Sequence, residues 1–448
     1  MSKDNALYAD NPFLSRRKRL LEHMQSCGGA SVAIFPTPGE QLRNGDSHYA
    51  YRPDSNFYYL TGFKEPGSVL VLTADQEQLR SYLFCRERDP EKEIWEGYIH
   101  GPGLAAERFS FDAAFSLETL NQQLPKLTEN RQTLWYTLGQ YSTWDEYITL
   151  LIRQLRQQAR AGNRPFDCIR DAHKILADMR IIKDEHEINC IRQAARVSAH
   201  AHQRAMRAVR PGMYEYELEA ELLYEFRRYG AWAPAYTPIV ASGANACVLH
   251  YSANDCQLAE SDWVLIDAGA EVEGYAGDIT RCFPANRCFT GPAADIYQLV
   301  LKAQLAGIEQ ARAGQTFQAP HDACVRVITQ GLVDLKILPA DDIDGLIEQE
   351  AYKPFFMHRT GHWLGCDVHD AGDYRESADP RQWRVLAPGM TLTIEPGCYL
   401  RANENVPVAF RGIGIRIEDD ILITDTDPDI LSADAPKQAD EIQLWMSS

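Results

Sequence analysis

Long apolar runs are missing from this sequence. None of its 448 residues lies in a stretch of about 18 or more apolar residues, which excludes a helical membrane span. The first thirty residues also lack a long apolar run, and the basic cluster at residues 16–19 leads into a polar, helix-like segment. We therefore expect no export signal, no membrane partner and a cytoplasmic location.

Paired cysteines are missing as well. The 11 cysteines are scattered without the pairwise spacing of a thiolate metal site, and their number is odd. In a chain without an export signal, this pattern favours reduced thiols over a disulfide framework.

Positive charge is scarce. Lysine and arginine number 45 against 63 aspartates and glutamates, which leaves a formal net charge of −18. This balance argues against a nucleic-acid partner bound through its phosphate backbone. It also leads us to expect that bound metal neutralises part of the acidic charge.

The sequence pattern changes near residues 177–184, which predicts a domain boundary there. Before it, strand-like runs such as SVAIFP and GSVLVLTA alternate with helical segments, as in an α/β domain. After it, Asp184 and Glu187 have the spacing of a capping box at the start of a helix. A second helix is expected over residues 215–229, and a weaker echo of helix, turn, helix and strands begins near residue 293.

Two aspartates flank a predicted hairpin in WVLIDAGAEVEGYAGDITRCF. Strand-like runs cover residues 263–270 and 275–283, and a loop over 271–274 would place Asp267 directly opposite Asp278. Opposed carboxylates repel each other, so a positive group should lie between them, and two metal ions about 3.5 to 4 Å apart would match the gap. The alternative is a solvated hairpin face. The apolar neighbours in both runs favour burial instead, where unpaired carboxylates are costly.

Three histidines lie close together in FFMHRTGHWLGCDVHDAG. A lone histidine in such a segment is most often a core residue, but His358, His362 and His369 together make a ligand or proton-transfer role equally plausible. Farther along, Glu395 ends an apolar strand just before a Pro-Gly turn.

The segment RGIGIRIEDDILIT contributes another acidic group. Its period of two places Arg416 and Glu418 on the same face of a strand. A structural ion pair between them is the alternative to a metal ligand. Asp420 would share the same face in an ideal strand, so the pattern does not choose between Glu418 and Asp420.

These segments together resemble the pita-bread metallopeptidases, and over nearly the whole chain the resemblance narrows to the bacterial Xaa-Pro aminopeptidases (aminopeptidase P). The matching stretches, in chain order, are SHYAYRPDSNFYYLTGFKEPGSVLVL, EIWEG, ILADMRIIKDEHEI, SGANACVLHY, VLIDAG, YAGDITRCFP, MHRTGHWLGCDVHD, LTIEPGCYL and RGIGIRIEDDILIT. Their number and order are more specific than any single motif.

The resemblance implies a mixed α/β (α+β) chain of two domains. Residues 1–177 would form a creatinase/prolidase-like α/β domain with roles in substrate access and oligomerisation. Residues 178–448 would form a pita-bread catalytic domain with pseudo-twofold symmetry, whose curved sheet holds the metals between its halves.

The resemblance also implies a dinuclear metal site with five ligands. Asp278 and Glu418 would bridge the two ions, Asp267 would bind one of them, and His362 with Glu395 would complete the other. Because hard oxygen donors dominate this set, two divalent cations are expected, with Mn²⁺ favoured over a structural zinc. A hydroxide bridging the ions would be the nucleophile, and Glu395 would also move a proton toward the leaving proline nitrogen.

Four further residues match family positions near the reaction centre. His250 and His369 match histidines that hydrogen-bond the substrate and stabilise the developing negative charge. Trp95 and Asp46 match residues that approach the active site, Trp95 from a neighbouring subunit, which implies a homotetramer or dimer. The alternatives are an amphipathic strand position for Trp95 and an ordinary loop acid for Asp46.

The implied activity is removal of the amino-terminal residue from peptides with proline in the second position. His358, Tyr399 and Arg416 match residues that line a pocket for the proline ring. A bond to proline has no N–H donor, so an enzyme for it needs such a pocket. The free amino terminus of the peptide would contact a metal ion and Asp267, which makes the enzyme an exopeptidase.

Two other functions remain open at this point. A prolidase would use the same metals on Xaa-Pro dipeptides only, and a catalytically dead pita-bread protein would only bind its partner. The intact ligand set argues against the second. The segment DYRESADPRQWRVLAPG is longer than expected for the family, so a basic substrate-contacting residue in it could be Arg381 or Arg384.

Overall fold

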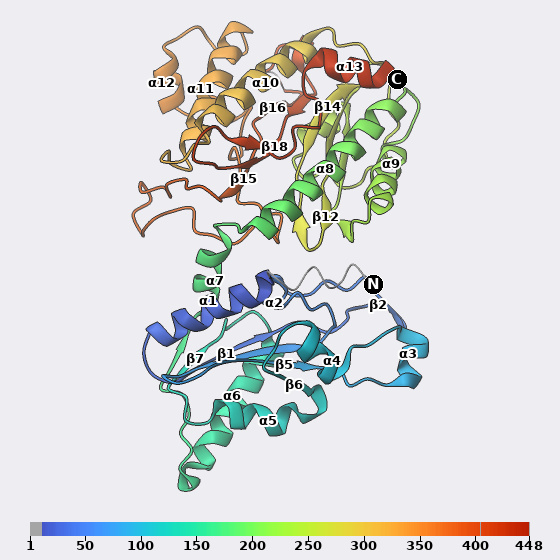
Figure 1. Ribbon diagram of the computed structural model, residues 1–448. Coiled ribbons are helices and arrows are strands. Elements are labelled where there is room, and N and C mark those ends of the chain that lie inside the picture. The colour runs from blue at the N-terminus through green and yellow to red at the C-terminus, as the bar shows by residue number, and fades with distance from the viewer. Residues whose placement is uncertain (1–10, 404, 448) are drawn as a thin grey trace. The chain divides into compact units, whose positions relative to one another are not determined.

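Two sets of strands, each with its own buried core, divide the chain into two units, residues 1–177 and 178–448. The computed structural model describes residues 11–403 and 405–447. In Figure 1 the first unit runs from blue to teal and the second from green to red. None of the helices in the described ranges combines the length and apolar character needed to cross a membrane.

The first unit is built on a six-stranded mixed sheet. Its strands, in spatial order, are β6 (Ala113–Ser116), β5 (Leu79–Cys85), β4 (Val69–Ala74), β1 (Ser31–Pro36), β7 (Thr133–Trp135) and β8 (Cys168–Arg170). The central strands β1 and β4 are antiparallel and entirely buried, which explains why their sequences are mostly apolar and do not alternate. The pairs β5–β6, β1–β7 and β7–β8 are parallel.

Helices cover both faces of this sheet. Those of the first unit are α1 (Pro12–Ser26), α2 (Ser55–Thr61), α3 (Pro90–Glu96), α4 (Gly101–Arg108), α5 (Leu120–Thr128) and α6 (Ser142–Gln157). In Figure 1, α1 and α2 lie on one face and α5 and α6 on the other. A short hairpin, β2 (Leu42–Asn44) and β3 (Ser47–His48), follows β1, and α7 (Ala172–Arg180) contains the boundary between the units.

The second unit repeats the order of two helices followed by strands. Its first half contains α8 (Glu185–Ala208), α9 (Glu215–Arg228), β9 (Ala233–Pro234), β10 (Ile239–Ser242), the 3-10 helix η4 (Gly243–Cys247), β11 (Trp263–Asp267), β12 (Ala270–Val272), β13 (Tyr275–Ala276) and β14 (Thr280–Pro284). The predicted capping box is confirmed, because Asp184 and Glu187 bond to each other's backbone amides.

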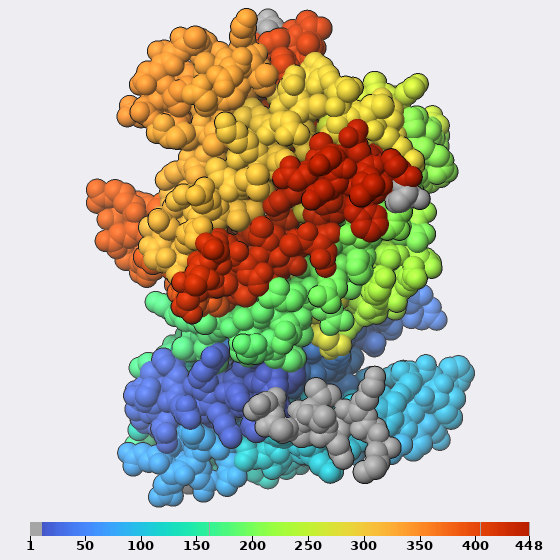
Figure 2. All heavy atoms as spheres, turned by 45° about the horizontal axis from the view of Figure 1, so that its top comes forward, coloured from blue at the N-terminus to red at the C-terminus, as the bar shows by residue number. Residues whose placement is uncertain are grey.

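The second half begins with another helix pair. Its elements are α10 (Pro292–Gln310), α11 (Ala319–Asp334), α12 (Ile343–Glu348), β15 (Thr391–Ile394), β16 (Gly397–Leu400), β17 (Ile413–Arg416), β18 (Asp419–Leu422), β19 (Asp429–Ile430) and α13 (Ala439–Ser447). The strands pair as β10–β11–β14 in the first half, and as β15–β18–β19 and β16–β17 in the second. The last part of the chain, red in Figure 2, lies beside the green helix α8, which α13 contacts.

The hairpin between β12 and β13 has a tighter turn than the sequence predicted. Glu273 and Gly274 form a two-residue turn with φ values of 48° and 75°, and Val272 pairs with Tyr275. Positive φ at both turn positions suits the right-handed twist of the flanking strands, which is why the two-residue turn is formed instead of a four-residue loop.

This turn shifts the register that the sequence predicted. Asp267 pairs with Thr280 and not with Asp278, so the expectation that the two aspartates lie directly opposite each other is wrong. Asp278 lies two positions before Thr280 and is therefore a diagonal neighbour of Asp267 on the same face.

Two glycines make this face possible. A Cβ atom on Gly269 would lie 1.7 Å from the carbonyl oxygen of Gly277, and one on Gly277 would lie 2.9 Å from the backbone of Ala194 in α8. The backbone between the two aspartates is therefore packed directly against its neighbours.

We predict that Gly269→Ala lowers the free energy of unfolding of the second unit by about 1–3 kcal/mol, because an extra methyl group in a packed interior forces the backbone to move. Urea unfolding followed by near-ultraviolet circular dichroism measures this change.

Gly345→Ala on α12 is the matched control. A Cβ atom there would meet only a carboxylate oxygen of Asp342, at 3.6 Å. The control should unfold as the wild type does, or be more stable by up to ~1 kcal/mol through helix propensity. Equal unfolding midpoints for the two variants would contradict the close approach at Gly269.

Candidate metal centre

The two hairpin aspartates converge on one hydroxyl group. Asp267 ends β11, and Asp278 lies just before β14. The hydroxyl of Tyr236 is 2.6 Å from Asp267 Oδ1 and 2.5 Å from Asp278 Oδ1. Since one hydroxyl hydrogen can be donated to only one acceptor at a time, Tyr236 holds both carboxylates near one point but cannot neutralise them.

Glu418 reaches the same place from the second half of the unit. It lies between β17 and β18, where the predicted continuous strand is broken in two. Its backbone amide donates to the Thr280 carbonyl oxygen at 3.1 Å, and the Thr280 hydroxyl donates to Glu418 Oε2 at 2.6 Å. The neighbouring Asp420 accepts instead from the backbone amide of Asp278, at 3.1 and 3.2 Å.

His362 presents one ring nitrogen to these carboxylates. Its Nδ1 atom lies 3.0 Å from the Trp363 carbonyl oxygen, which can only accept, so Nδ1 carries the hydrogen. Nε2 then faces Asp278 Oδ2 at 3.3 Å and Glu395 Oε1 at 4.0 Å. Asp278, His362 and Glu418 each offer a ligand atom within 4.8 Å of the others, so these three residues could hold a metal ion together and form a candidate metal-binding group.

Glu395 lies where the sequence predicted it, directly after β15 and before Pro396. Its backbone amide donates to the Thr360 carbonyl oxygen at 2.7 Å. Its carboxylate lies between two histidines, because Oε2 is 3.8 Å from His358 Nδ1 and Oε1 is 4.0 Å from His362 Nε2.

The site has more acidic groups than its basic groups can balance. Burial and the charge of Asp278 raise the pKa of Glu418 well above its ordinary value, and burial raises the pKa of Glu395 to about 7. Burial also raises the pKa of Asp267, against the opposing charge of Arg416. Burial lowers the pKa of His362, but the hydrogen bond and charge of Asp278 outweigh it and raise that pKa to about 9.

A divalent cation would relieve this imbalance. Carboxylates are raised in pKa when they are buried beside like charges, and a bound cation of charge two removes that cost. The donor set of carboxylate oxygens and one imidazole nitrogen is suited to such an ion. The residues therefore fit a metal centre.

A hydrogen-bonded chain borders the metal centre. Arg416 Nη1 donates to the Tyr399 hydroxyl oxygen at 2.9 Å, and the Tyr399 hydroxyl lies 2.8 Å from His358 Nε2. His358 Nδ1 lies 2.7 Å from the Arg359 carbonyl oxygen, so Nδ1 carries the hydrogen and Nε2 accepts from Tyr399. Burial, together with the charge of Arg416, lowers the pKa of His358 to about 4 and keeps it neutral.

Arg416 also ties this chain to the acidic groups. Its Nη2 atom pairs with Asp267 Oδ2 at 2.5 Å, and its Nε donates to the Thr280 hydroxyl at 3.1 Å. The predicted ion pair of Arg416 is therefore formed mainly with Asp267 and not with Glu418.

Two more predicted histidines lie at the exposed side of the site. The ring of His369 is 4.2 Å from the ring of His362 in a T-shaped arrangement, and partial burial followed by the charge of His362 lowers its pKa. His250 is exposed, and its charge contributes to lowering the pKa of both His358 and His369. The structure thus places His369 against His362, whereas His250 is related to the site through its electrostatic effect on His358 and His369.

Two of the predicted site residues, Trp95 and Asp46, belong to the first unit. Trp95 lies on α3 with 88% of its surface exposed, so a strand position for it is wrong. Asp46 lies exposed in the turn between β2 and β3. Their role at the site remains a prediction, as does the choice between Arg381 and Arg384, which pair with the nearby Asp379 and with Asp178 respectively.

Sequence analysis missed two residues that hold the site together. Tyr236 lies in the segment AYTPIV, far along the chain from both aspartates, and no spacing rule connects it to them. Thr280 could have been found, because it lies two residues after Asp278 and shares its strand face.

Comparison with known proteins agrees with this geometry. Residues 189–425 match the model of metallopeptidase family M24, and residues 13–135 match the amino-terminal domain of aminopeptidase P. The Xaa-Pro aminopeptidase of Escherichia coli K12 is 43% identical over 97% of both chains, and human Xaa-Pro aminopeptidase 3 is 33% identical over 94% of this chain and 81% of its own.

Solved structures of aminopeptidases are similar to this chain as well. The aminopeptidase PepP of Pseudomonas aeruginosa superimposes with a TM-score of 0.93 at 45% identity and covers 97% of both chains. A zinc-substituted E. coli aminopeptidase P in complex with product gives a TM-score of 0.93 at 43% identity and covers 97% of this chain and 98% of its own. The chain therefore belongs to metallopeptidase family M24 and carries the amino-terminal domain of aminopeptidase P.

Proposed function

We propose that this protein removes the amino-terminal residue from peptides whose second residue is proline. The observation that carries the proposal is the position of Glu395 between the metal-binding group and the His358–Tyr399–Arg416 chain. The carboxylate of Glu395 is thereby near both the candidate cation site and the residues assigned to the proline pocket. The relatives named Xaa-Pro aminopeptidase support this assignment.

Two divalent cations are the proposed cofactor. Their ligands are the five residues Asp267, Asp278, His362, Glu395 and Glu418, and the oxygen-rich donor set favours Mn²⁺. When bound, the cations supply Lewis acidity, which activates a water molecule at neutral pH and polarises the scissile carbonyl.

The side chains around the cations orient the peptide. Asp267, held by Tyr236 and Arg416, is assigned the further role of binding the free amino group of the substrate. Glu395 is anchored through its backbone, so its carboxylate can pass a proton to the leaving nitrogen of proline. That nitrogen carries no hydrogen in the intact peptide bond, so it must receive one before it leaves. We assign to His250 and His369 the role of donating hydrogen bonds to the substrate.

Proline specificity is assigned to the chain of His358, Tyr399 and Arg416. Their hydrogen bonds fix the ring of His358 and the ring of Tyr399 at an interplanar angle of 59°. The ring of His358 is partly exposed, and the fully buried Tyr399 holds it in place, so a pyrrolidine ring can pack against His358 without ordering new side chains.

The location and assembly of the protein are also proposals. All 11 cysteines are free thiols, which favours the reducing cytoplasm. On α3, Ile94 and Trp95 expose 80% and 88% of their surfaces. Two exposed large apolar groups on one short helix favour burial against another copy of the chain, and a homotetramer or dimer in which Trp95 reaches a neighbouring site is the proposed assembly.

We predict that the protein releases the first residue of an Xaa-Pro-Xaa tripeptide. Activity should disappear after metal removal, return with Mn²⁺, and be lost in Glu395→Ala, because proton transfer and metal binding both need this carboxylate. Product release measured by chromatography, with an Xaa-Pro dipeptide alongside, tests the prediction.

The other outcomes of this experiment identify the competing functions. Cleavage of the dipeptide alone would make the protein a prolidase. No cleavage of either peptide, combined with substoichiometric metal by elemental analysis, would indicate a binding protein.

We predict that Tyr399→Phe lowers kcat/KM for the tripeptide roughly tenfold, because a hydrogen bond to a charged group is worth about 1.5 kcal/mol or more. Metal content should not change. Tyr297→Phe is the matched control, since its buried hydroxyl donates only to the Lys437 carbonyl oxygen, at 2.7 Å, in another part of the unit. An equal loss in both variants would contradict a specific role for Tyr399.

We predict that Ile94→Asp shifts the assembly toward the monomer, because a charge would be buried in the proposed interface. Sedimentation velocity measures the mass of the wild type and the variant. Leu444→Asp on α13, which also replaces an exposed leucine, should keep the wild-type mass. A monomeric wild type would contradict the assembly.

A further inference from the structure

One buried carboxylate holds both sides of the loop that carries His250. Glu215 is the first residue of α9 and is fully buried. Its Oε1 atom accepts from the Ser242 backbone amide and hydroxyl, both at 2.7 Å, and from Asn245 Nδ2 at 3.1 Å. These donors precede His250 in the sequence.

The other carboxylate oxygen is bound to residues that follow His250. Glu215 Oε2 accepts from the Tyr251 hydroxyl at 2.8 Å and from the Cys256 backbone amide at 3.0 Å. All five hydrogen bonds therefore come from residues 242–256, a segment with little regular structure after η4.

A neighbouring carboxylate of α9 strengthens the same attachment. Glu219, one helical turn after Glu215 on the same face, accepts from Asn254 Nδ2 at 3.0 Å. Asn254 is buried with φ at 48°, and its Oδ1 atom accepts from the Val240 backbone amide at 3.0 Å. The loop is thus bound to one face of α9 at several points.

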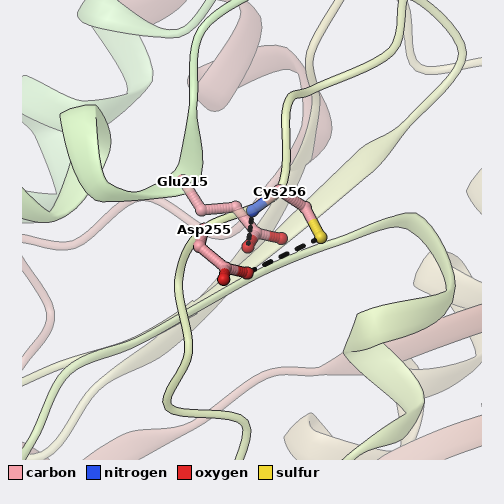
Figure 3. A group of neighbouring side chains, drawn as sticks. All are labelled: Glu215, Asp255 and Cys256. Atoms are coloured by element: carbon pink, nitrogen blue, oxygen red, sulfur yellow. Dashed lines mark hydrogen bonds between the residues drawn. The ribbon is translucent and has the colours of Figure 1, made fainter.

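These contacts argue against a second metal site at this position. Figure 3 shows Glu215 with Asp255 and Cys256, whose possible ligand atoms lie within 4.8 Å of one another. Both oxygens of Glu215 already accept hydrogen bonds, and a cation would have to displace them. Asp255 and Cys256 are exposed, and the thiol of Cys256 points toward Asp255 Oδ1 at 4.0 Å.

The arrangement instead fixes a loop. A buried carboxylate is tolerated only when it is fully hydrogen-bonded, and bonds to a charged acceptor are about twice as strong as neutral ones. The first turn of a helix also favours an anion through the helix dipole. If one part of the loop moved away, Glu215 would lose some of its hydrogen bonds while it remained buried. This cost opposes local movement, so the parts of the loop are held together.

We propose that Glu215 is a positioning residue that sets the location of His250 at the active site. The proposal rests on the peptidase function, in which His250 donates to the substrate. A displacement of about 1 Å in a catalytic arrangement can cost on the order of 100-fold in rate, so this attachment controls turnover without Glu215 touching the substrate.

Glu215→Gln tests the proposal, because it keeps the size of the side chain and replaces one accepting oxygen with an amide that donates. We expect kcat/KM for the Xaa-Pro-Xaa tripeptide to fall about 10- to 100-fold at unchanged metal content. In a His250→Ala background the same substitution should cost less than about 2-fold, because residues that act through each other are not additive. An equal loss in both backgrounds would overturn the proposal.

Two further variants keep the test decisive. Glu221→Gln, on the same helix, removes only an ion pair with Arg204 of α8 and should retain wild-type kinetics. If Glu215→Gln does not fold, Tyr251→Phe removes a single donor. It should give a smaller fall in kcat/KM, again absent in the His250→Ala background, and no fall would count against the proposal.

Amide hydrogen exchange separates this proposal from the proposed function. Exchange over residues 243–253 should be faster in Glu215→Gln than in the wild type, with α8 unchanged, whether or not the protein is a peptidase. Unchanged exchange would overturn the attachment even in an active enzyme. Faster exchange in a protein without peptidase activity would overturn the function and, with it, the role of His250.

Discussion

The structure of the second unit depends on a buried cluster of carboxylates that its own basic groups do not neutralise. Glu418, Glu395 and Asp267 all have raised pKa values, and in each case burial is the largest cause. Such a cluster is unfavourable unless each member is held by donors or by a cation. Arg416, itself buried, is the one guanidinium that pairs directly with these ligands among the described residues. The Tyr236 hydroxyl holds two of the carboxylates without neutralising them, so the remaining imbalance fits a cation site.

The need to gather these groups explains how the two halves of the unit are joined. Thr280 belongs to the first half and Glu418 to the second, and they exchange a backbone and a side-chain hydrogen bond. Arg281, fully buried beside them, donates to the Glu418 carbonyl oxygen at 2.6 Å and to the Asp419 carboxylate at 2.7 Å. The metal-binding group therefore exists only when both halves are folded against each other, which couples folding to function.

Much of this site could be predicted from sequence, because local patterns determine where each candidate lies in its own segment. The capping box at Asp184, the strand end at Glu395 and the spacing of the histidines required no distant information. The register of the hairpin was missed because a four-residue loop and a two-residue turn fit the same apolar alternation, and only the backbone conformation of Glu273 and Gly274 decides between them. Tyr236 was missed because its contact with the aspartates is purely tertiary.

The sequence does not show which of the consecutive acidic residues Glu418, Asp419 and Asp420 is available for a metal. Asp419 is paired with Arg281 and with Lys437, and these charges keep its pKa below the ordinary value despite complete burial. Glu418 and Asp420, on either side, have raised pKa values because burial and the charge of Asp278 act on them together. A carboxylate that is paired with cationic side chains has a structural role. A carboxylate without such partners is available for a metal. Asp420 accepts from the Asp278 amide, and Glu418 is the one of the two with an oxygen within 4.8 Å of ligand atoms of both Asp278 and His362.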